Sequence, residues 1–390
     1  MKNHFHTMYN SIIQSNFKKI DKITHRKTNT KMNLVKTYAI IAVVCSHYSG
    51  GGIVFPLSNW ISPFFYFMPL FVFSSGYFYN SKYDSTTFIS FLKNKIISLV
   101  IPYFIWNIFY GLLSTLLRKL QIINYGDNIN FSSLFIRPWI DGHQFHLNIP
   151  SWFMLSLFID VIIVYLFRKL MKKLHILNDS ILLIFLFVLS IISIIIAQKG
   201  YNHDFFLCIT KAGFMLPYFQ LGYFYKKHEL ALTKHKATII GIMFILLYIC
   251  LVLSSKAGLT VQVVFSNFTG NPFLITATTT LSILITVTIC DILTPSFENS
   301  KILNAIGNNT FSIMMHHGLI IFSINFFIYI LTFFFDVSSF NITKFKSTLW
   351  YAYPWRDSRI FMFYVILGIA IPVLCKLLYN KIIIRLYNKL

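Results

Sequence analysis

Lys36 and His47 are the residues whose types and spacing first indicate chemistry. They begin and end the apolar segment KTYAIIAVVCSH. If this segment is an α-helix, eleven residues turn about 1100°, three full turns plus roughly 20°, and rise about 16 Å. The ammonium and the imidazole then share one face, with Lys36 near a membrane edge and His47 near mid-depth. A neutral imidazole there can accept a proton from a hydroxyl that attacks a carbonyl.

The predicted position of His47 deep in the bilayer favours a functional role for its side chain. An ionisable side chain inside a bilayer is costly unless it faces a cavity or a partner. On the functional interpretation, Lys36 holds the phosphates of a nucleotide-bearing donor such as acyl-CoA, whose thioester arm reaches His47. On the structural one, His47 is a core histidine bonded to a helix carbonyl, and Lys36 anchors the helix at the lipid head groups.

The composition places these residues in a membrane protein. Of 390 residues, 56% are hydrophobic and 12% charged, and the mean hydropathy is +0.65. So few charges cannot cover a water-soluble domain, and apolar runs of about eighteen residues or more indicate spanning helices. We expect an all-α polytopic membrane helical bundle. The ten predicted spans are 34–56, 60–80, 96–117, 150–168, 180–198, 205–225, 238–255, 272–293, 310–335 and 359–379.

The distribution of the lysine and arginine residues predicts how the chain is oriented in the membrane. The formal net charge is +22, but the basic residues lie between the apolar runs and not along one soluble face with interleaved aromatics, so nucleic acid is not expected as a partner. Their excess on one side follows the positive-inside rule and predicts both termini in the cytoplasm. Residues 1–33 are then a basic cytoplasmic tail, and residues 34–390 form one membrane domain.

The five cysteines suggest neither a metal site nor a disulfide framework, because they are scattered through the predicted spans without a CxxC pair. Cys45 lies two residues before His47, on a different helix face, and is expected to be a buried small hydrophobe. The cysteines are Cys45, Cys208, Cys250, Cys290 and Cys375.

Two long segments, 118–149 and 336–358, are predicted to lie outside. Both mix aromatic rings with polar groups, which suits a sugar with apolar faces and a hydroxylated rim; an interfacial aromatic belt is the alternative. Their residues of this kind are Trp139, Asp141, His143, Gln144 and His146, then Trp350, Tyr351, Tyr353, Trp355, Arg356 and Asp357.

Six motifs in order carry a resemblance to a known family. The Lys36 and His47 pair, with ten residues between, resembles the Arg-x10-His signature of the integral-membrane acyltransferase 3 family. The wording of the second motif is most similar to the fucose 4-O-acetylase-like branch. The other five are FMPLFVFSSGYF (67–78), FLKNKIISLVIPYFIW (91–106), SWFMLSLF (151–158), FMLPYFQLGYFYKK (214–227) and GNNTFSIMMHHGLI (307–320).

The resemblance implies ten spans and transfer of an acyl group, usually acetyl, from acyl-CoA to hydroxyls of lipid-linked or surface carbohydrates in the bacterial plasma membrane. No permanently bound cofactor or metal is implied. Lys36 lacks the bidentate fork of arginine. Ser98 stands where relatives often carry arginine, so Lys93 and Lys95 are expected to contact the donor. Met314 replaces the usual tyrosine.

Further site residues follow from the motifs. Ser75 is a candidate catalytic hydroxyl, although small residues at helix contacts usually serve packing, as we expect for Gly76. Asp160 either orients an imidazole by accepting its distal ring proton or pairs with an intramembrane cation.

Three more residues are candidates for contact with the acceptor. His317, the second histidine of the late motif, either contacts the acceptor sugar or bonds a helix carbonyl. Trp152 and Tyr103 stand at motif positions that the resemblance places beside the acceptor.

Two other classes of protein compete with an acyltransferase. A transporter or flippase for a polysaccharide precursor would require paired halves, helix breaks and intramembrane acids. Only Asp160 and Asp291 qualify as such acids, and no repeat is visible. A structural partner of a glycan assembly complex is the other alternative.

Overall fold

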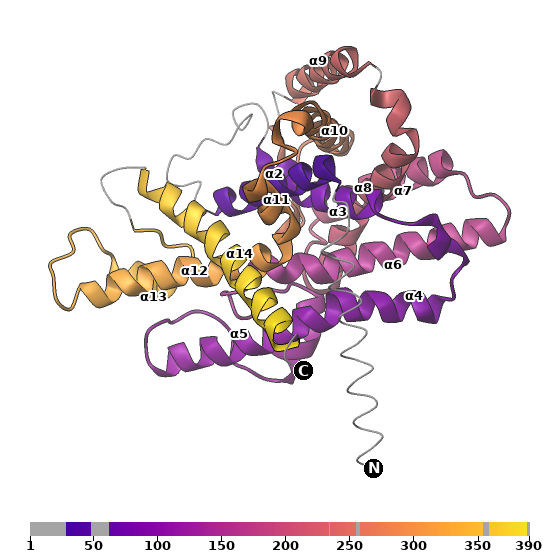
Figure 1. Ribbon diagram of the computed structural model, residues 1–390. Helices are drawn as coiled ribbons and strands as arrows, with labels where there is room; N and C mark the ends of the chain where they lie inside the picture. Colours follow the sequence, from indigo (N-terminus) through magenta and orange to yellow (C-terminus); the bar gives the residue numbers. More distant parts are fainter. Residues whose placement is uncertain (1–28, 48–61, 234, 255–257, 354–358, 388–390) are drawn as a thin grey trace.

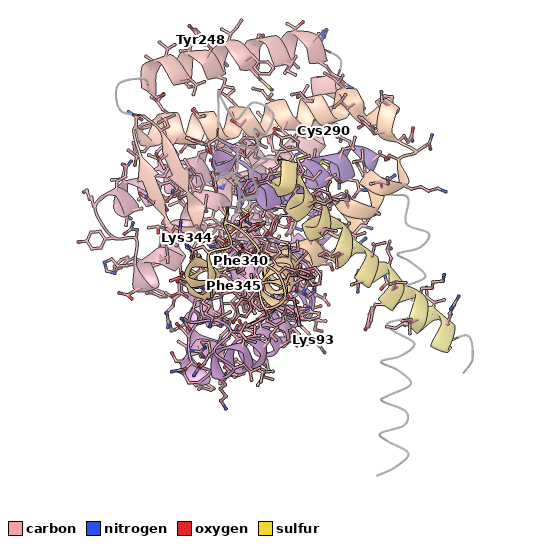
Figure 2. The ribbon with its side chains drawn as sticks, turned by 90° about the vertical axis from the view of Figure 1, so that its left-hand side faces the viewer. Lys93, Tyr248, Cys290, Phe340, Lys344 and Phe345 are labelled. Carbon is pink, nitrogen blue, oxygen red and sulfur yellow. The ribbon has the colours of Figure 1, made fainter. Side chains whose placement is uncertain are left out.

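The computed structural model describes residues 29–47, 62–233, 235–254, 258–353 and 359–387. Its helices pack around a central pair, α2 and α3 (Figure 1). Helix α9, which carries Tyr248, and helix α4, which carries Lys93, lie at opposite edges (Figure 2). The helices are α2 (Thr30–Ser46), α3 (Phe67–Tyr77), α4 (Phe88–Lys95), α5 (Ile101–Lys119), α6 (Trp152–Lys173), α7 (Asp179–Gln198), α8 (Asp204–Thr233), α9 (Lys236–Ser254), α10 (Pro272–Phe297), α11 (Lys301–Asn308), α12 (Thr310–Leu331), α13 (Ile342–Ser347) and α14 (Arg359–Tyr387).

The architecture is an all-α membrane bundle. Each of the ten predicted spans overlaps a helix, and within the described residues seven helical segments are long and apolar enough to cross a membrane. Helices α2 and α3 have only 17 and 11 residues. Helix α8 is long enough, with 30 residues, but more polar. The seven segments are Phe88–Lys119, Ile149–Lys173, Asp179–Gln198, Lys236–Ser254, Pro272–Phe297, Thr310–Leu331 and Phe361–Arg385.

Helix α2 is buried among α3, α10, α11, α12 and α14. It begins where the Asn29 side chain accepts a hydrogen bond of 3.0 Å from the backbone N–H of Met32, a standard N-terminal cap. It ends at Ser46, so the predicted span 34–56 is too long for this helix and His47 is its C-cap, not a residue at mid-helix. The rest of that span, 48–56, lies outside the described residues.

Glycines bring α3 and α8 into close contact. A Cβ on Gly76 would lie 1.8 Å from the backbone oxygen of Phe219, and one on Gly222 would lie 2.0 Å from that of Phe73. Neither distance is physically possible, so both positions require glycine at this helix spacing. The packing role predicted for Gly76 is confirmed, and α3 is held at a fixed position beside α2.

A buried ion-pair network joins α6, α7 and the 3-10 turn Ser81–Ser85 (η3). Arg168 is 2% exposed, and its guanidinium contacts Asp84 at 2.9 Å and Asp179 at 2.8 Å. Tyr79 also donates to Asp84, at 2.7 Å. Paired and hydrogen-bonded charges of this kind fix helices in register.

Irregular segments gather at the C-terminal end of α2. A hairpin of strands β1 (Thr260–Gln262) and β2 (Asn267–Thr269) pairs antiparallel, with Thr260 opposite Thr269. The turn Ile149–Ser151 (η7) leads into α6, and residues 348–350 follow α13. The sequence analysis expected neither the hairpin nor the short helices α11 and α13, because each is too short for a span-length hydropathy pattern.

Candidate functional site

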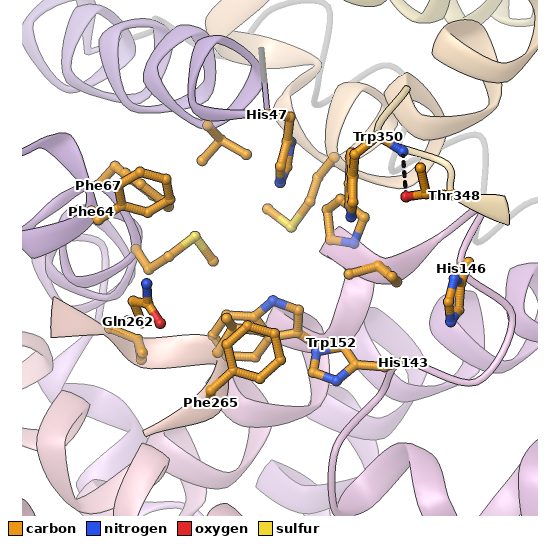
Figure 3. A pocket seen from close by; sticks show the side chains of 17 residues that line it. His47, Phe64, Phe67, His143, His146, Trp152, Gln262, Phe265, Thr348 and Trp350 are labelled. Atoms are coloured by element: carbon orange, nitrogen blue, oxygen red, sulfur yellow. Dashed lines mark hydrogen bonds between the residues drawn. The ribbon is translucent and has the colours of Figure 1, made fainter. Parts of the chain in front are cut away.

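A cavity of about 480 Å³ lies between the end of α2 and the irregular segments (Figure 3). Its wall combines residues from α2, α3, α12, the segment 143–152, the hairpin and the segment 348–350. Most of the lining is apolar or aromatic, and no aspartate or glutamate belongs to it. The polar side chains in the wall are His47, His143, His146, Gln262 and Thr348.

His47 and His317 form a pair at one side of this cavity. His317 Nε2 lies 3.0 Å from His47 Nδ1, and His317 Nδ1 lies 2.8 Å from the carbonyl oxygen of Ile313. His317 is fully buried, whereas His47 lines the cavity. The sequence analysis singled out both histidines, and the structure brings them together although 270 residues separate them.

The carbonyl of Ile313 decides which nitrogen carries each proton. A carbonyl oxygen only accepts, so His317 donates from Nδ1 and its Nε2 holds a lone pair while the ring is neutral. That lone pair accepts the Nδ1–H of His47. The Nε2 of His47 is therefore the unprotonated nitrogen, and the His47 ring lies at the wall of the cavity (Figure 3).

Trp350 covers one face of the His47 ring. The two ring centroids are 4.3 Å apart and the planes differ by 15°, which is a face-to-face contact. If His47 takes up a proton, the indole face lies where it stabilises the positive charge. Trp350 comes from the second outer segment of the sequence analysis, and His143 and His146 come from the first.

The two segments predicted to lie outside thus both contribute to the cavity that His47 lines. Trp355, Arg356 and Asp357 of the second segment lie outside the described residues. Trp152, one of the two expected acceptor contacts, lines the cavity. Tyr103, the other, is fully buried in α5 and is not part of the wall.

Lys36 lies on α2 about three turns before His47, as predicted, but it does not line the cavity. Ile40 and Val43 occupy the same helix stripe between the two residues and are 0% and 4% exposed. The cavity reaches Val43 and no further along this stripe. Lys36 and His47 therefore share a face of the helix, while buried side chains separate the ammonium from the cavity.

Lys93 and Lys95, the other expected donor contacts, lie on α4 away from this cavity. Lys93 is exposed and Lys95 half-buried. The Lys95 ammonium lies 5.4 Å from the ring centroid of Phe91 and 5.8 Å from that of Tyr83. Both amines stand just before α5.

Asp160 and Ser75 do not touch the histidine pair. Asp160 is fully buried in α6, and within the described residues its two carboxylate oxygens have no hydrogen-bond partner. The Ile313 carbonyl takes the orienting place that the sequence analysis gave to this carboxylate. Ser75 donates to the Phe71 carbonyl of its own helix, at 3.0 Å, and is absent from the cavity wall.

Two parts of the site were not predicted. The hairpin contributes Gln262, Val263, Val264 and Phe265 to the wall, and Lys211 is buried in α8 behind Trp152, with its ammonium 4.8 Å from the indole centroid. A lysine inside an apolar run was the signal available for Lys211. Among the described residues, no group of three histidine, cysteine, aspartate or glutamate side chains has the arrangement of a metal site.

Comparison with known proteins identifies the family of the chain. No curated protein and no solved structure gives a significant match to the chain. The sequence model of a family described as "Acyltransferase domain" matches residues 29–376. This range contains both histidines, both outer segments and all seven apolar segments except the end of the last. Because the match covers most of the chain, the chain belongs to this family, the acyltransferase 3 family.

Proposed function

We propose that this membrane acyltransferase moves an acetyl or similar short acyl group from acyl-CoA to a hydroxyl of a lipid-linked or cell-surface polysaccharide, with His47 as the general base. The observation that carries the proposal is the proton order of the His47–His317 pair. It leaves a lone pair on His47 Nε2 at the wall of a cavity large enough for a sugar unit and an acyl group.

The reaction uses that lone pair twice. The acceptor hydroxyl gives its proton to His47 Nε2 while its oxygen attacks the thioester carbonyl. The tetrahedral intermediate then collapses, the carbon–sulfur bond breaks, and imidazolium returns the proton to the leaving CoA thiolate. Between these steps His317 Nε2 accepts the Nδ1–H of His47, and Trp350 lies against the charged ring.

The donor side of the proposal places Lys36 at the phosphates of acyl-CoA and the thioester arm along the α2 stripe toward His47. It requires the side chains of Ile40 and Val43 to move aside when donor binds, because they fill the stripe in this structure. Lys93 and Lys95 supply further positive charge before α5. With the positive-inside orientation, this end of α2 faces the cytoplasm.

Substitution of His47 tests the base. His47→Ala should lower acyl transfer by about 100-fold or more, the usual contribution of a general base. The measurement is transfer of radiolabelled acetyl from acetyl-CoA to the cell's polysaccharide, with the amount of folded protein followed by size exclusion. Thr348→Val, at another cavity residue, is the matched control. Full activity in His47→Ala would remove the proposed mechanism.

Substitution of Lys36 tests the donor anchor separately. Lys36→Ala should raise the KM for acetyl-CoA by roughly tenfold, because one charge-assisted phosphate contact is lost, while kcat changes less. Lys36→Arg should retain or lower the KM, since arginine offers two parallel donors. An unchanged KM in Lys36→Ala would leave His47 in place and reject the anchor.

A further inference from the structure

Lys211 is a buried cation without a counter-charge. Its side chain is 2% exposed in α8, and within the described residues no carboxylate lies in ion-pair distance of it. Its ammonium rests on the Trp152 ring instead, 4.8 Å from the centroid. An unpaired charge at such a place is costly unless a ligand supplies the counter-charge. Such a charge therefore indicates a binding site.

The carboxylate that attracts Lys211 is already engaged. Asp141 attracts Lys211, but its carboxylate contacts Arg137 at 3.2 Å and accepts hydrogen bonds from the Gln144 side chain and from the backbone N–H of His143. Since the cavity wall contains no carboxylate, the charge of Lys211 stays uncompensated on this side of the cavity.

Two side chains of the cavity wall near Lys211, those of Trp152 and His143, each have a ring nitrogen without a hydrogen-bond partner among the described residues. The indole nitrogen of Trp152 is turned toward the open space (Figure 3), and within the described residues it has no hydrogen-bond partner. His143 lines the same wall, and its buried Nε2 also has no partner in this part of the chain. Burial and the neighbouring charge of Lys211 lower the pKa of His143 to about 4, so at neutral pH the ring is uncharged and one of its two nitrogens carries a proton.

A cation against the Trp152 ring, beside an unpartnered indole N–H and an unpartnered imidazole nitrogen, at a cavity whose wall has no acids, has the chemistry of an oxyanion site. We propose that the wall formed by Trp152 and His143, with the Lys211 ammonium against the Trp152 ring, binds a carboxylate or phosphate group of the acceptor. This inference rests on the proposed function for the identity of the ligand as an acceptor. An acidic sugar unit supplies the carboxylate, and the linker of a lipid-bound glycan supplies the phosphate.

The test measures binding, so it needs no acyl donor and does not depend on His47. The full-length protein in nanodiscs is titrated with tetragalacturonate, with its methyl ester, in which each carboxylate is an uncharged ester, and then with inorganic diphosphate. We expect the wild type to bind at least one of the two anions roughly tenfold or more tightly than the neutral ester, as a charged hydrogen bond would give. Binding of tetragalacturonate indicates an acidic sugar unit as the ligand, and binding of diphosphate indicates the phosphate linker of a lipid-bound glycan.

Variants connect that preference to Lys211. Lys211→Met should bring the dissociation constants of the anion and the ester within about twofold, and Lys211→Arg should keep them apart. Lys226→Met is the matched control, because Lys226 lies on the same helix with its ammonium 5.6 Å from the ring centroid of Tyr77, far from the cavity; it should keep the preference.

The inference is overturned if the wild type binds neither anion more tightly than the ester, a result that needs no variant to fold. It is also overturned if folded Lys211→Met keeps the wild-type preference. If acyl transfer fails in every assay while the Lys211-dependent preference remains, the anion site stands and only the proposed reaction falls.

Discussion

At the scale of single residues, one backbone carbonyl determines the chemistry of the site. The Ile313 oxygen accepts from His317 and so fixes the tautomers of both imidazoles. Carboxylates usually orient a catalytic histidine, which is why Asp160 was the sequence-based candidate. A carbonyl has no side-chain signature, so the sequence offered a helix carbonyl only as one of two alternatives for His317, and the structure confirms that alternative.

The first prediction concerns His317 as a positioning residue. His317→Ala should lower kcat by roughly 10- to 1000-fold with little change in the acceptor KM, because His47 loses the acceptor that holds its Nδ1 proton. His317→Gln should recover part of the loss, since its amide oxygen can accept the same hydrogen bond. Steady-state kinetics over a range of pH provide the measurement.

A merely structural role for His317 would give a different result. Alanine and glutamine would then reduce the amount of folded protein and leave the kcat of the remaining protein and its pH dependence unchanged. His316→Gln is a useful comparison, because the neighbouring ring bonds to Tyr110 at 2.7 Å and not to His47.

At the scale of helices, the position of His47 depends on how tightly α2 and α3 are held. The glycine contacts between α3 and α8 leave no room for a side chain, and α3 packs directly against α2. The motif ending in Ser75 and Gly76 therefore acts through helix spacing. The Ser75 hydroxyl bonds within its own helix, and the side chain is only partly buried.

The requirement for glycine at position 76 is testable by comparison with a second helical glycine, Gly241. Gly76→Ala should destabilise the protein by about 1–3 kcal/mol, the usual cost of overpacking, because the new Cβ meets the Phe219 carbonyl at 1.8 Å. Gly241→Ala in α9 has no atom within 4 Å of its Cβ and should be neutral or stabilising. Thermal unfolding in detergent compares the two.

Equal unfolding temperatures for the two alanine variants would mean that α3 and α8 can separate without cost. In that case the close approach of α3 and α8 would not determine the position of α2 or of His47.

At the scale of the whole molecule, the helices were predictable from the sequence, whereas the tertiary contacts between distant segments were not. All ten predicted spans overlap helices, and both histidines were identified, because hydropathy and motif order are local properties. The contacts that build the cavity are not local. Trp350 and His143 come from segments some 200 residues apart in the chain, and the β1–β2 hairpin is too short to detect by periodicity.

Orientation in the membrane is also a property of the whole chain. Under the positive-inside prediction, the segment that carries Lys344 faces outward and the end of α6 that carries Lys173 faces the cytoplasm. In a background with the native cysteines replaced, Lys344→Cys should react with a membrane-impermeant maleimide in intact cells. Lys173→Cys should react only after the cells are opened. Both lysines are exposed.

The reverse labelling pattern would place the His47 cavity on the cytoplasmic side. The acceptor would then have to be modified before export, and the donor would enter from the same side as the acceptor.

The way the cavity wall is divided among the elements has a consequence for how such proteins diversify. The pair that handles the proton stands on two core helices, α2 and α12, whereas much of the surface opposite it belongs to a hairpin and two connecting segments. Under the proposed function, exchange of those connections between relatives would change which glycan is recognised and leave the acyl chemistry intact. Substrate range in this architecture can therefore evolve by loop replacement alone.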